Sequence, residues 1–512
     1  MTEQASGVPG PSGVGDPADD AAAVSEQMRM RRAKVDRLVA AGVDPYPVTF
    51  GRTATVADLR ARFGGLPVDH ATGERVAIAG RVVLSRVGGK LCFATLRDGT
   101  GDLQVMLSLD RVGDERLAAW KSDVDLGDQI GVEGEVVTSR RGELSVLADA
   151  WTMTAKALRP LPDKHKGLSD PEARVRQRYV DLIVNPAARR MLEVRSATVR
   201  TLRQSLSNRG YVEVETPMLQ AVQGGATARP FTTHHNALDI DLFLRIAPEL
   251  YLKRLIVGGV ERVFEINRNF RNEGISSRHN PEFTMLEAYQ AYGDYNTMAT
   301  LTREIVQESV LAATGSLVVP RPGGGEIDLS GEWRSVAVLE AVSEAVGDKV
   351  TLDAGIDAVR AQAAAAGVPY DAAWGMGAVV LEMYERLVEH VTVEPTFFRD
   401  FPKDVSPLTR QHRDDPLLAE RWDLVVDGRE LGTAYSELVD PVEQRRRLTE
   451  QAGAKAAGDA EAMEVDEDFL RALEYGMPPS GGMGMGIDRL LMLMTGVPSI
   501  RECILFPLVR PE

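Results

Sequence analysis

The sequence predicts an α+β protein in which a small β-barrel precedes a larger mixed domain. Between residues 74 and 155, short segments alternate apolar and polar side chains with the two-residue period of a β-strand. Further along, strand patterns near residues 280, 425 and 485 are separated by helical patterns. The 512 residues suffice for two to four domains with substantial hydrophobic cores.

The N-terminal residues come before the barrel. Residues 1 to 24 consist mainly of Gly, Pro, Ser, Asp and Ala without periodicity, which predicts a disordered tail. Residues 25 to 73 are expected to form a helical segment, whose first helix ends at Asp44-Pro45-Tyr46-Pro47.

Five short strands are expected in the barrel, with a helix (Asp114 to Lys121) between the third and the fourth. Their sequences are VAIAGRVVL, KLCFATLRDG, DLQVMLSL, QIGVEGEVV and ELSVLADAW. Five strands with a helix in that position are typical of an OB-fold, here over residues 74 to 157. A Pro-containing, charged linker over residues 158 to 180 leads into the larger domain, residues 181 to 512.

The composition excludes several classes of protein. No run of eighteen apolar residues occurs, and the N-terminus lacks a signal pattern, so we expect no membrane association and a cytoplasmic protein. Two cysteines, Cys92 and Cys503, are too few for a disulfide framework or a thiolate metal site. The net charge of −16 argues against nonspecific nucleic-acid binding over the whole surface.

The segment Phe270 to Tyr292 reads as strand, polar loop, strand. Because side chains alternate along a strand, four residues of the second strand share one face. They are Phe283, Met285, Glu287 and Tyr289, and the loop carries Arg271, Glu273, Arg278 and His279. An aromatic ring, a carboxylate and a phenol below an Arg-rich loop suit an anionic aromatic ligand bound beside a cationic group.

A second glycine-rich segment lies near the C-terminus. Gly482, Gly484 and Gly486 alternate with apolar residues and run into Asp488-Arg489, a helix start. The segment matches neither a dinucleotide fingerprint, which opens a βαβ unit, nor the Gly-Lys-Ser/Thr of a phosphate loop. Glycines that alternate in this way indicate a strand closely approached by another backbone.

A helix is predicted at about residues 188 to 209, since Leu192, Val199, Leu202 and Leu206 recur at helical spacing. Gly210 suits a left-handed cap. The short strand Tyr211 to Val214 then leads to Pro217.

A two-residue turn at Asp427-Gly428 predicts a hairpin. We expect Asp423 opposite Gly432 and Val425 opposite Glu430, which makes Asp423 and Glu430 diagonal neighbours. Such a pair is close enough to share a hard cation, and oxygen ligands beside phosphates favour Mg²⁺. On an edge hairpin the two carboxylates are otherwise surface charges.

These segments resemble motifs 1, 2 and 3 of the class II aminoacyl-tRNA synthetases. In detail, RNEGISSRHNPEFTMLE, RIAPELYLKRL and SELVDPVEQ resemble lysyl-tRNA synthetases of the bacterial type, from about Ser25 to the C-terminus. The resemblance implies an OB-fold anticodon-binding domain followed by a class II catalytic domain, built on an antiparallel sheet flanked by helices. It also implies a helical insertion at about residues 300 to 395.

The implied reaction joins L-lysine to ATP, releases pyrophosphate, and transfers lysine to the 3′ end of tRNA(Lys). Arg271 would hold the α-phosphate and Arg489 the γ-phosphate, and both are the expected catalytic residues. Glu273 would contact adenine and Phe283 would stack on it. The implied ATP-binding set is Arg271, Glu273, Arg278, His279, Phe283, Gly486 and Arg489.

The resemblance also implies the lysine pocket, where carboxylates would offset the desolvation of the substrate ammonium. The implied set is Gly225, Glu249, Glu287, Tyr289, Thr433, Tyr435 and Glu437. Glu430 has the opposite strand parity to Glu437, so a bulge near Gly432 is required if both act in one site. Thr433 replaces the family's usual Asn, and Asp423 replaces the usual Glu of the magnesium-binding pair Asp423 and Glu430.

For tRNA, the resemblance points to one face of the barrel. Cys92 and Ala94 alternate inward, which turns Phe93 outward to stack on an unpaired base. Gln104 also faces out and can read a base edge. The implied anticodon set is Arg86, Phe93, Gln104 and Glu143, and the implied assembly is a homodimer through the helix at 188 to 209.

Three alternatives remain open. A ligase that attaches lysine to a translation factor shares the catalytic core but lacks the N-terminal barrel. A nucleic-acid-binding barrel protein leaves residues 181 to 512 unexplained. A silent regulatory paralogue would have lost Arg271, Arg489 or the carboxylate pair, and all are present.

Overall fold

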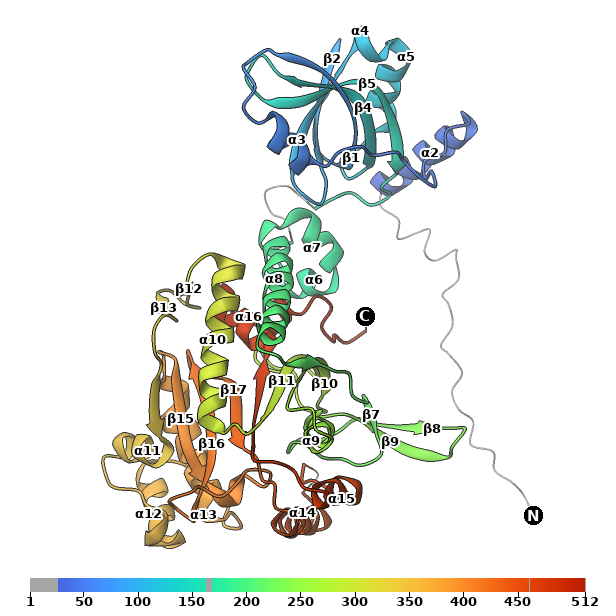
Figure 1. Ribbon diagram of the computed structural model, residues 1–512. Helices are drawn as coiled ribbons and strands as arrows, with labels where there is room; N and C mark the ends of the chain where they lie inside the picture. The colour runs from blue at the N-terminus through green and yellow to red at the C-terminus, as the bar shows by residue number, and fades with distance from the viewer. Residues whose placement is uncertain (1–25, 163–167, 460, 512) are drawn as a thin grey trace, which may run out of the picture. The chain divides into compact units, whose positions relative to one another are not determined.

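The computed structural model describes residues 26–162, 168–459 and 461–511. The expected disordered tail, residues 1 to 24, and five residues of the expected linker, 163–167, lie outside the described residues. The chain divides into two compact units, within Met1–Gly167 and Leu168–Glu512 (Figure 1). No helix of the described residues is long and apolar enough to span a membrane.

The N-terminal unit is a five-stranded closed barrel with strand order β1-β2-β3-β5-β4, as expected for an OB-fold. Its strands are β1 (Ala71–Arg86), β2 (Leu91–Arg97), β3 (Asp102–Ser108), β4 (Gln129–Thr138) and β5 (Leu144–Ala155). Its helices are α2 (Glu26–Ala40), α3 (Val56–Phe63), α4 (Leu109–Val112) and α5 (Asp114–Asp123). The predicted helix between the third and fourth strands is thus confirmed as α5.

Strand alternation fills the barrel. On β2, Cys92, Ala94 and Leu96 are buried in the core, whereas Phe93 between them stays partly exposed. The outward position predicted for Phe93 is therefore confirmed.

The C-terminal unit is built on an eight-stranded sheet of order β14-β15-β16-β17-β18-β11-β10-β6 (Figure 1). Neighbouring strands are antiparallel except for β14-β15 and β10-β6, which are parallel. The strands are β6 (Val212–Glu213), β10 (Arg262–Phe270), β11 (Glu282–Ala291), β14 (Arg334–Ala337), β15 (Thr396–Pro402), β16 (Leu418–Val426), β17 (Arg429–Ser436) and β18 (Ser480–Gly486). This arrangement confirms the expected antiparallel sheet flanked by helices.

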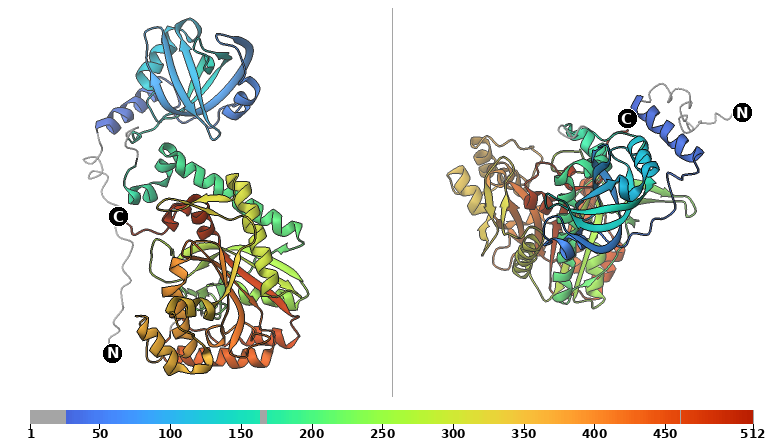
Figure 2. Two further views of the ribbon diagram at one scale, coloured as in Figure 1. Left: turned by 90° about the vertical axis from the view of Figure 1, so that its left-hand side faces the viewer. Right: turned by 90° about the horizontal axis from the view of Figure 1, so that it is seen from above.

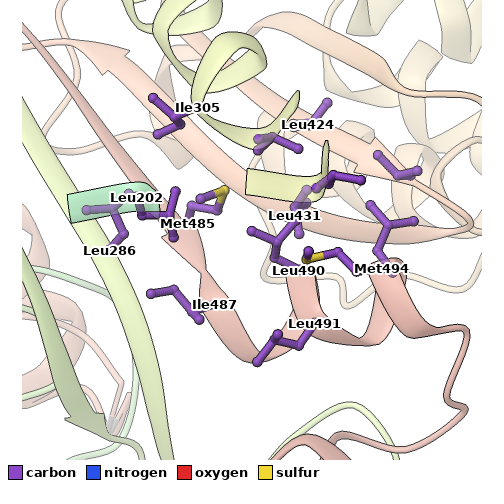
Figure 3. Packing of buried hydrophobic residues seen from close by; sticks show 14 of the residues in the cluster. Leu202, Leu286, Ile305, Leu424, Leu431, Met485, Ile487, Leu490, Leu491 and Met494 are labelled. Atoms are coloured by element: carbon purple, nitrogen blue, oxygen red, sulfur yellow. The ribbon is translucent and has the colours of Figure 1, made fainter. Parts of the chain in front are cut away.

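One face of this sheet packs on three helices, α8 (Pro186–Asn208), α10 (Tyr295–Thr314) and α16 (Ile487–Thr495). Helices α8 and α10 run side by side (Figures 1 and 2). Figure 3 shows Leu202 and Ile305 of these helices meeting Leu286, Leu424 and Met485 of the sheet. We call this side of the sheet the back face.

The opposite side of the sheet, the front face, is only partly covered. Helix α9 (Glu249–Val257) packs on β10 and β11 together with α14 (Pro441–Ala456) and α15 (Glu467–Glu474). A separate hydrophobic cluster on β14, β15 and β16 is formed with α11 (Val338–Val346), α12 (Ile356–Ala365) and α13 (Met376–Leu387). Between these two groups the front face carries polar side chains.

The remaining elements are short or peripheral. The helices are α6 (Pro171–Arg176), α7 (Arg178–Val184), α17 (Ile500–Cys503) and three 3₁₀ turns, η1 (Leu352–Ala354), η2 (Glu389–Val391) and η3 (Lys403–Val405). The strands are β7 (Leu219–Gln220), β8 (Thr232–His235), β9 (Ile240–Leu244), β12 (Val318–Pro320) and β13 (Glu326–Asp328). Strands β7, β9 and β8 form a small sheet that projects from the unit (Figure 1).

The register of the β16–β17 hairpin confirms one predicted pair and corrects another. Val425 lies opposite Glu430, as predicted, but Asp423 lies opposite Thr433 rather than Gly432. The cause is a β-bulge at Leu431, whose side chain packs into the back-face core. Gly432 also faces the back, since it lies opposite Leu424, and a Cβ there would come within 2.7 Å of the Gly484 carbonyl oxygen. The bulge that the sequence required near Gly432 is thus present.

Candidate active site

The bulge places the predicted residues of β16 and β17 on the front face, in register with β11 and β18. One row across the sheet runs Glu287, Gly484, Thr433, Asp423, since each is the register partner of the next. The adjacent row runs Tyr289, Gly482, Tyr435, Arg421 in the same order. Residues far apart in sequence are therefore neighbours across four strands.

The glycines of β18 make room for this polar surface. A Cβ on Gly482 would collide with Oε1 of Glu437 and with the ring of Tyr289. Neither contact is tolerable, so only glycine lets Glu437 and Tyr289 lie over the strand. The segment is a strand, β18, as predicted, but what closely approaches Gly482 is a pair of side chains on the front face and not another backbone.

A cavity opens above the same face, at the end formed by the β10–β11 loop and the start of α16. All seven predicted ATP-binding residues line it: Arg271, Glu273, Arg278, His279, Phe283, Gly486 and Arg489. Glu430 and Thr433 line it as well, whereas Asp423 does not.

Cationic side chains converge on this cavity. The Arg271 guanidinium carbon lies 5.2 Å from the centre of the Phe283 ring, and its buried Nε has no hydrogen-bond partner among the described residues. Arg489 donates from Nη1 to the backbone oxygen of Glu430 at 2.7 Å. These arginines suit an anionic ligand with an aromatic portion.

His279 lies beside the arginines of this cavity, and its imidazole favours the neutral form. Its Nε2 lies 3.3 Å from Nη2 of Arg489, and its Nδ1 lies 2.9 Å from the Ser276 hydroxyl. Burial, and then the charge of Arg489, lower the pKa of His279 below its ordinary value. The imidazole can therefore contribute a hydrogen bond rather than a cation.

Next to the cavity, three carboxylates are buried together: Glu249 at the start of α9, Glu287 on β11 and Glu437 directly after β17. We call them, with Tyr289 and Tyr435, the acidic pocket. Burial, reinforced by the charge of Glu249, raises the pKa of Glu287 to about 8. The Tyr289 hydroxyl donates to Glu287 Oε2 at 3.2 Å. Glu287 thus has no cationic hydrogen-bond partner among the described residues.

One residue that the sequence alone did not single out also lies in the acidic pocket. The Lys253 ammonium is fully buried, 2.6 Å from Glu249 Oε1 and 2.5 Å from Glu437 Oε2. Glu437 is therefore already paired within the protein. The i, i+4 spacing of Glu249 and Lys253 on α9 is a signal that could have identified the first of these contacts.

Gly225 and Thr433 border the pocket. Gly225 adopts a positive φ of 89°, and a Cβ there would contact Ala247 and Glu249 at 3.4–3.6 Å. The Thr433 hydroxyl donates to the Trp422 carbonyl at 3.1 Å.

Asp423, one of the two predicted metal ligands, is paired with an arginine of the same strand. Arg421 contacts both oxygens of Asp423, at 3.0 Å from Nε and 2.8 Å from Nη2. Burial raises the pKa of Asp423, the Glu430 charge adds to this, and Arg421 opposes it. Arg421 can reach Asp423 because side chains two residues apart on a strand point to the same face.

A third carboxylate, Glu389 of η2, also belongs to this region. Burial and the charges of Glu430 and Asp423 raise the pKa of Glu389 to about 7. Mutual repulsion of this kind is relieved by a bound cation. Among the described residues, no group of three or more His, Cys, Asp or Glu side chains is arranged to hold a metal ion.

One buried ion pair connects the three motif-like segments. Arg195 of α8 contacts Asp488 of α16 at 2.5 Å and donates to the Thr284 hydroxyl of β11 at 2.8 Å. Asp488 also accepts from the Thr284 backbone at 2.8 Å. These contacts connect helix α8, strand β11 and helix α16.

The helix predicted to form a dimer interface is only partly free. Leu202 and Leu206 are fully buried in the core of this unit and so are not available to an interface. Leu192 and Val199 instead line a surface groove along α8.

In the N-terminal unit, all four predicted anticodon residues line one depression of the barrel surface: Arg86, Phe93, Gln104 and Glu143. Gln104 donates from its amide to the Ser145 hydroxyl at 2.8 Å, which holds the side chain in place. Arg140 and Arg141 contribute positive charge to the same depression.

A barrel that leads to an antiparallel sheet with an Arg-lined cavity defines a class of enzyme, and sequence comparison identifies it. Residues 170–510 match the family model "tRNA synthetases class II (D, K and N)", and residues 76–154 match "OB-fold nucleic acid binding domain". The chain belongs to the class II tRNA synthetases of the D, K and N group.

Within that class, similar proteins include several that are named lysine–tRNA ligase. The chain is 56% identical over 502 residues to the lysine–tRNA ligase of Mycobacterium tuberculosis (strain ATCC 25177 / H37Ra), covering 97% of this chain and 99% of that one. It is 57% identical over 490 residues to the lysine–tRNA ligase of Mycolicibacterium gilvum, covering 95% and 97%. It is also 56% identical over 491 residues, 95% of this chain and 43% of the relative, to a lysylphosphatidylglycerol biosynthesis bifunctional protein of Nocardia farcinica.

Proposed function

We propose that this chain is a lysine–tRNA ligase, which activates L-lysine with ATP and transfers the lysyl group to tRNA(Lys). The observation that carries the proposal is the acidic pocket beside the Arg-lined cavity, since a cationic amino acid and an anionic nucleotide must meet to react. The relatives named lysine–tRNA ligase span both units of the chain. A lysine ligase without the barrel and a silent paralogue are therefore not favoured.

In the first step, the lysine carboxylate attacks the α-phosphorus of ATP and pyrophosphate leaves. Arg271 is placed to bridge the carboxylate and the α-phosphate, since a planar guanidinium can hold two anionic oxygens. Arg489, across the cavity, is placed to bind the γ-phosphate. Glu273 would accept from the adenine amino group, and Phe283 would stack on the ring. Catalysis then consists of positioning and charge stabilisation, without a protein nucleophile.

The acidic pocket supports lysine as the amino acid. An ammonium group taken from water needs anionic partners, and Glu287 and Glu437 supply them for the substrate ε-ammonium. Glu249, beside Gly225, is placed to bind the α-ammonium. The tyrosines Tyr289 and Tyr435 border the methylene chain.

Magnesium is proposed as the metal cofactor, held by Glu430 and Asp423. The donor set fits, because carboxylate oxygens beside bound phosphates are what Mg²⁺ takes, with only one or two ligands from the protein. The raised pKa of Glu389 supports the fit, since the charges of Glu430 and Asp423 act on it although each of the two also lies near an arginine. When bound, Mg²⁺ would neutralise phosphate charge, and Arg421 would keep Asp423 oriented.

The barrel is proposed to bind the anticodon of tRNA(Lys) through the depression of the N-terminal unit. Phe93 would stack on an unpaired base and Gln104 would read a base edge. For assembly, we propose a homodimer through the groove of α8, where Leu192 is exposed and Val199 is half-buried. Both cysteines are unpaired and buried, which supports the proposed cytoplasmic location.

The function is tested by aminoacylation of tRNA(Lys) with radiolabelled lysine, in parallel with lysine-dependent ATP–pyrophosphate exchange without tRNA. The proposal predicts activity in both assays. Exchange without aminoacylation would remove tRNA as the acceptor and would restore the protein-ligase alternative.

A further inference from the structure

The proposed reaction makes no use of the buried cation in the acidic pocket. Lys253 is fully enclosed, donates a hydrogen bond to Glu249 and forms an ion pair with Glu437. Burial alone would lower the pKa of the Lys253 ammonium, but Glu249 and Glu437 raise it above its ordinary value. A charge so far from water persists only when its partners offset the desolvation, so Lys253 and the two carboxylates form one electrostatic unit.

The charges of this unit can be compared with those of the substrate. Glu249, Glu287 and Glu437 contribute three negative charges when ionised, and Lys253 contributes one positive charge. The difference, three minus one, leaves two negative charges. L-lysine has two ammonium groups, and its carboxylate is assigned to Arg271. The pocket and the two ammonium groups therefore neutralise one another.

We infer that Lys253 is a specificity-determining residue, a fixed internal cation that matches the charge of the acidic pocket to the two ammonium groups of lysine. This inference rests on the proposed lysine activation. Lys253 also positions the carboxylates, because it connects α9 to the residue that follows β17.

The geometry indicates that Lys253 stays in place when lysine binds. It lies one turn after Glu249 on α9, between Leu250 and Ile256 of the helix's buried core, and its side chain is inaccessible. The contact with Glu437 lacks hydrogen-bond geometry, and both Glu437 oxygens have no hydrogen-bond partner among the described residues. Glu437 can therefore accept from the substrate ammonium without releasing Lys253.

A consequence for selectivity follows. An amino acid with a neutral side chain supplies a single ammonium group and leaves one buried carboxylate uncompensated, which costs binding energy. Without Lys253, the three carboxylates would repel one another and hold protons more tightly, and lysine would have to displace those protons in order to bind.

The pH dependence of lysine binding then distinguishes a fixed cation from a merely structural side chain. Among the described residues, Lys253 contacts Glu249 on its own helix and Glu437 after β17. The other titratable groups of the acidic pocket are Glu287 and Tyr289 on β11 and Tyr435 on β17, and Tyr289 interacts electrostatically with all four of the others. Removing a cation raises the pKa of the carboxyls beside it. Lysine binding, which needs them ionised, must then shift to higher pH.

The experiment compares Lys253→Met and Lys253→Arg with the parent in ATP–pyrophosphate exchange, between about pH 6.5 and 9.5. For Lys253→Met we expect KM for lysine to rise at least about tenfold at pH 7, because a carboxyl pKa higher by about one lowers the ionised fraction about tenfold, and to recover toward pH 9. KM for ATP should stay near the parent value at every pH. Lys253→Arg keeps the charge and should keep the parent pH profile, and Lys349→Met, an exposed lysine, is the control.

A Lys253→Met protein with an unshifted pH profile, or with tighter lysine binding, overturns the inference, the second result by showing that Lys253 competes with the substrate. If Lys253→Met does not fold, Lys253→Gln, which can still donate hydrogen bonds, undergoes the same test with the same expected change in the pH profile. A parent protein without lysine-dependent exchange would overturn the proposed function itself. An active parent with unshifted variants removes only the role of Lys253.

Discussion

The Glu287→Gln substitution is expected to abolish lysine activation and yet stabilise the free protein at alkaline pH. Glu287 is buried on β11, and burial together with the charge of Glu249 raises its pKa from 4.5 to about 8. At neutral pH the free pocket therefore retains a proton at this position. A bound ε-ammonium requires the ionised carboxylate, so lysine must displace that proton.

The size of the effect follows from the pKa. At pH 7, below the pKa of about 8, ionising the carboxyl costs about 1.4 kcal/mol, a factor of ten in affinity. KM of the parent for lysine should thus fall about tenfold from pH 7 to 9. In the variant, the loss of the charge partner costs about 3–5 kcal/mol, which is two to three and a half decades in kcat/KM at about 1.4 kcal/mol per decade.

The same substitution should lower activity but raise the stability of the free protein at alkaline pH. Because the folded-state pKa lies above the unfolded value, the folded state holds a proton that the unfolded chain loses between pH 4.5 and about 8. The contribution of this group to stability is present below pH 4.5 and is lost as the pH rises through that window. Glutamine never ionises, so the free variant should melt above the parent at pH 8.5.

The assay combines pyrophosphate exchange from pH 7 to 9 with thermal melting, with and without lysine. Glu282→Gln is the matched control, since Glu282 is an exposed carboxylate of the same strand. A variant that activated lysine nearly as well as the parent, or a parent KM for lysine that did not change with pH, would refute the assignment of Glu287.

Three further outcomes are expected. Glu430→Ala should abolish adenylate formation while leaving lysine binding, measured by calorimetry without ATP, partly intact; an unchanged magnesium dependence would contradict the metal assignment. Phe93→Ala should weaken aminoacylation by about one to two decades, since base stacking is worth about 1–3 kcal/mol, with exchange unaltered; an equal loss in both assays would indicate a misfolded barrel. In sedimentation at assay concentration the protein should be a dimer, and a fully active monomer would exclude the groove of α8 as an obligatory interface.

Much of the fold could be predicted because it depends on local periodicity. The alternation of Cys92, Ala94 and Leu96 correctly predicted which face of β2 is inside the barrel. The glycines at 482, 484 and 486 correctly predicted a strand, but the nearest atoms are side chains rather than the expected second backbone. The Asp427-Gly428 turn gave the hairpin and the Val425–Glu430 pair correctly. The strand parity of Glu430 and Glu437 predicted that a bulge must exist if both act in one site. Its position could not be predicted, because the bulge arises from the burial of Leu431 in a core that the sequence does not reveal.

The internal partners of the site could not be predicted in the same way. Lys253 lies in a largely apolar helix and contacts Glu437 only because the fold brings α9 beside the residue that follows β17. Arg421 lies two residues before Asp423 on the same strand and pairs with it. Strand alternation places both on one face, but the contact itself depends on the rotamer of a long side chain. The apolar spacing predicted helix α8 correctly but could not show which of its residues are covered, and Leu202 and Leu206 pack inside the unit.

The most direct test of the central claim is ATP–pyrophosphate exchange measured with each of the twenty amino acids in turn. The acidic pocket beside the Arg-lined cavity predicts exchange with lysine well above every other amino acid, and none above background with aspartate or asparagine, the substrates of the neighbouring D and N enzymes. Exchange that was strongest with an amino acid lacking a cationic side chain would contradict the pocket and the proposed function together.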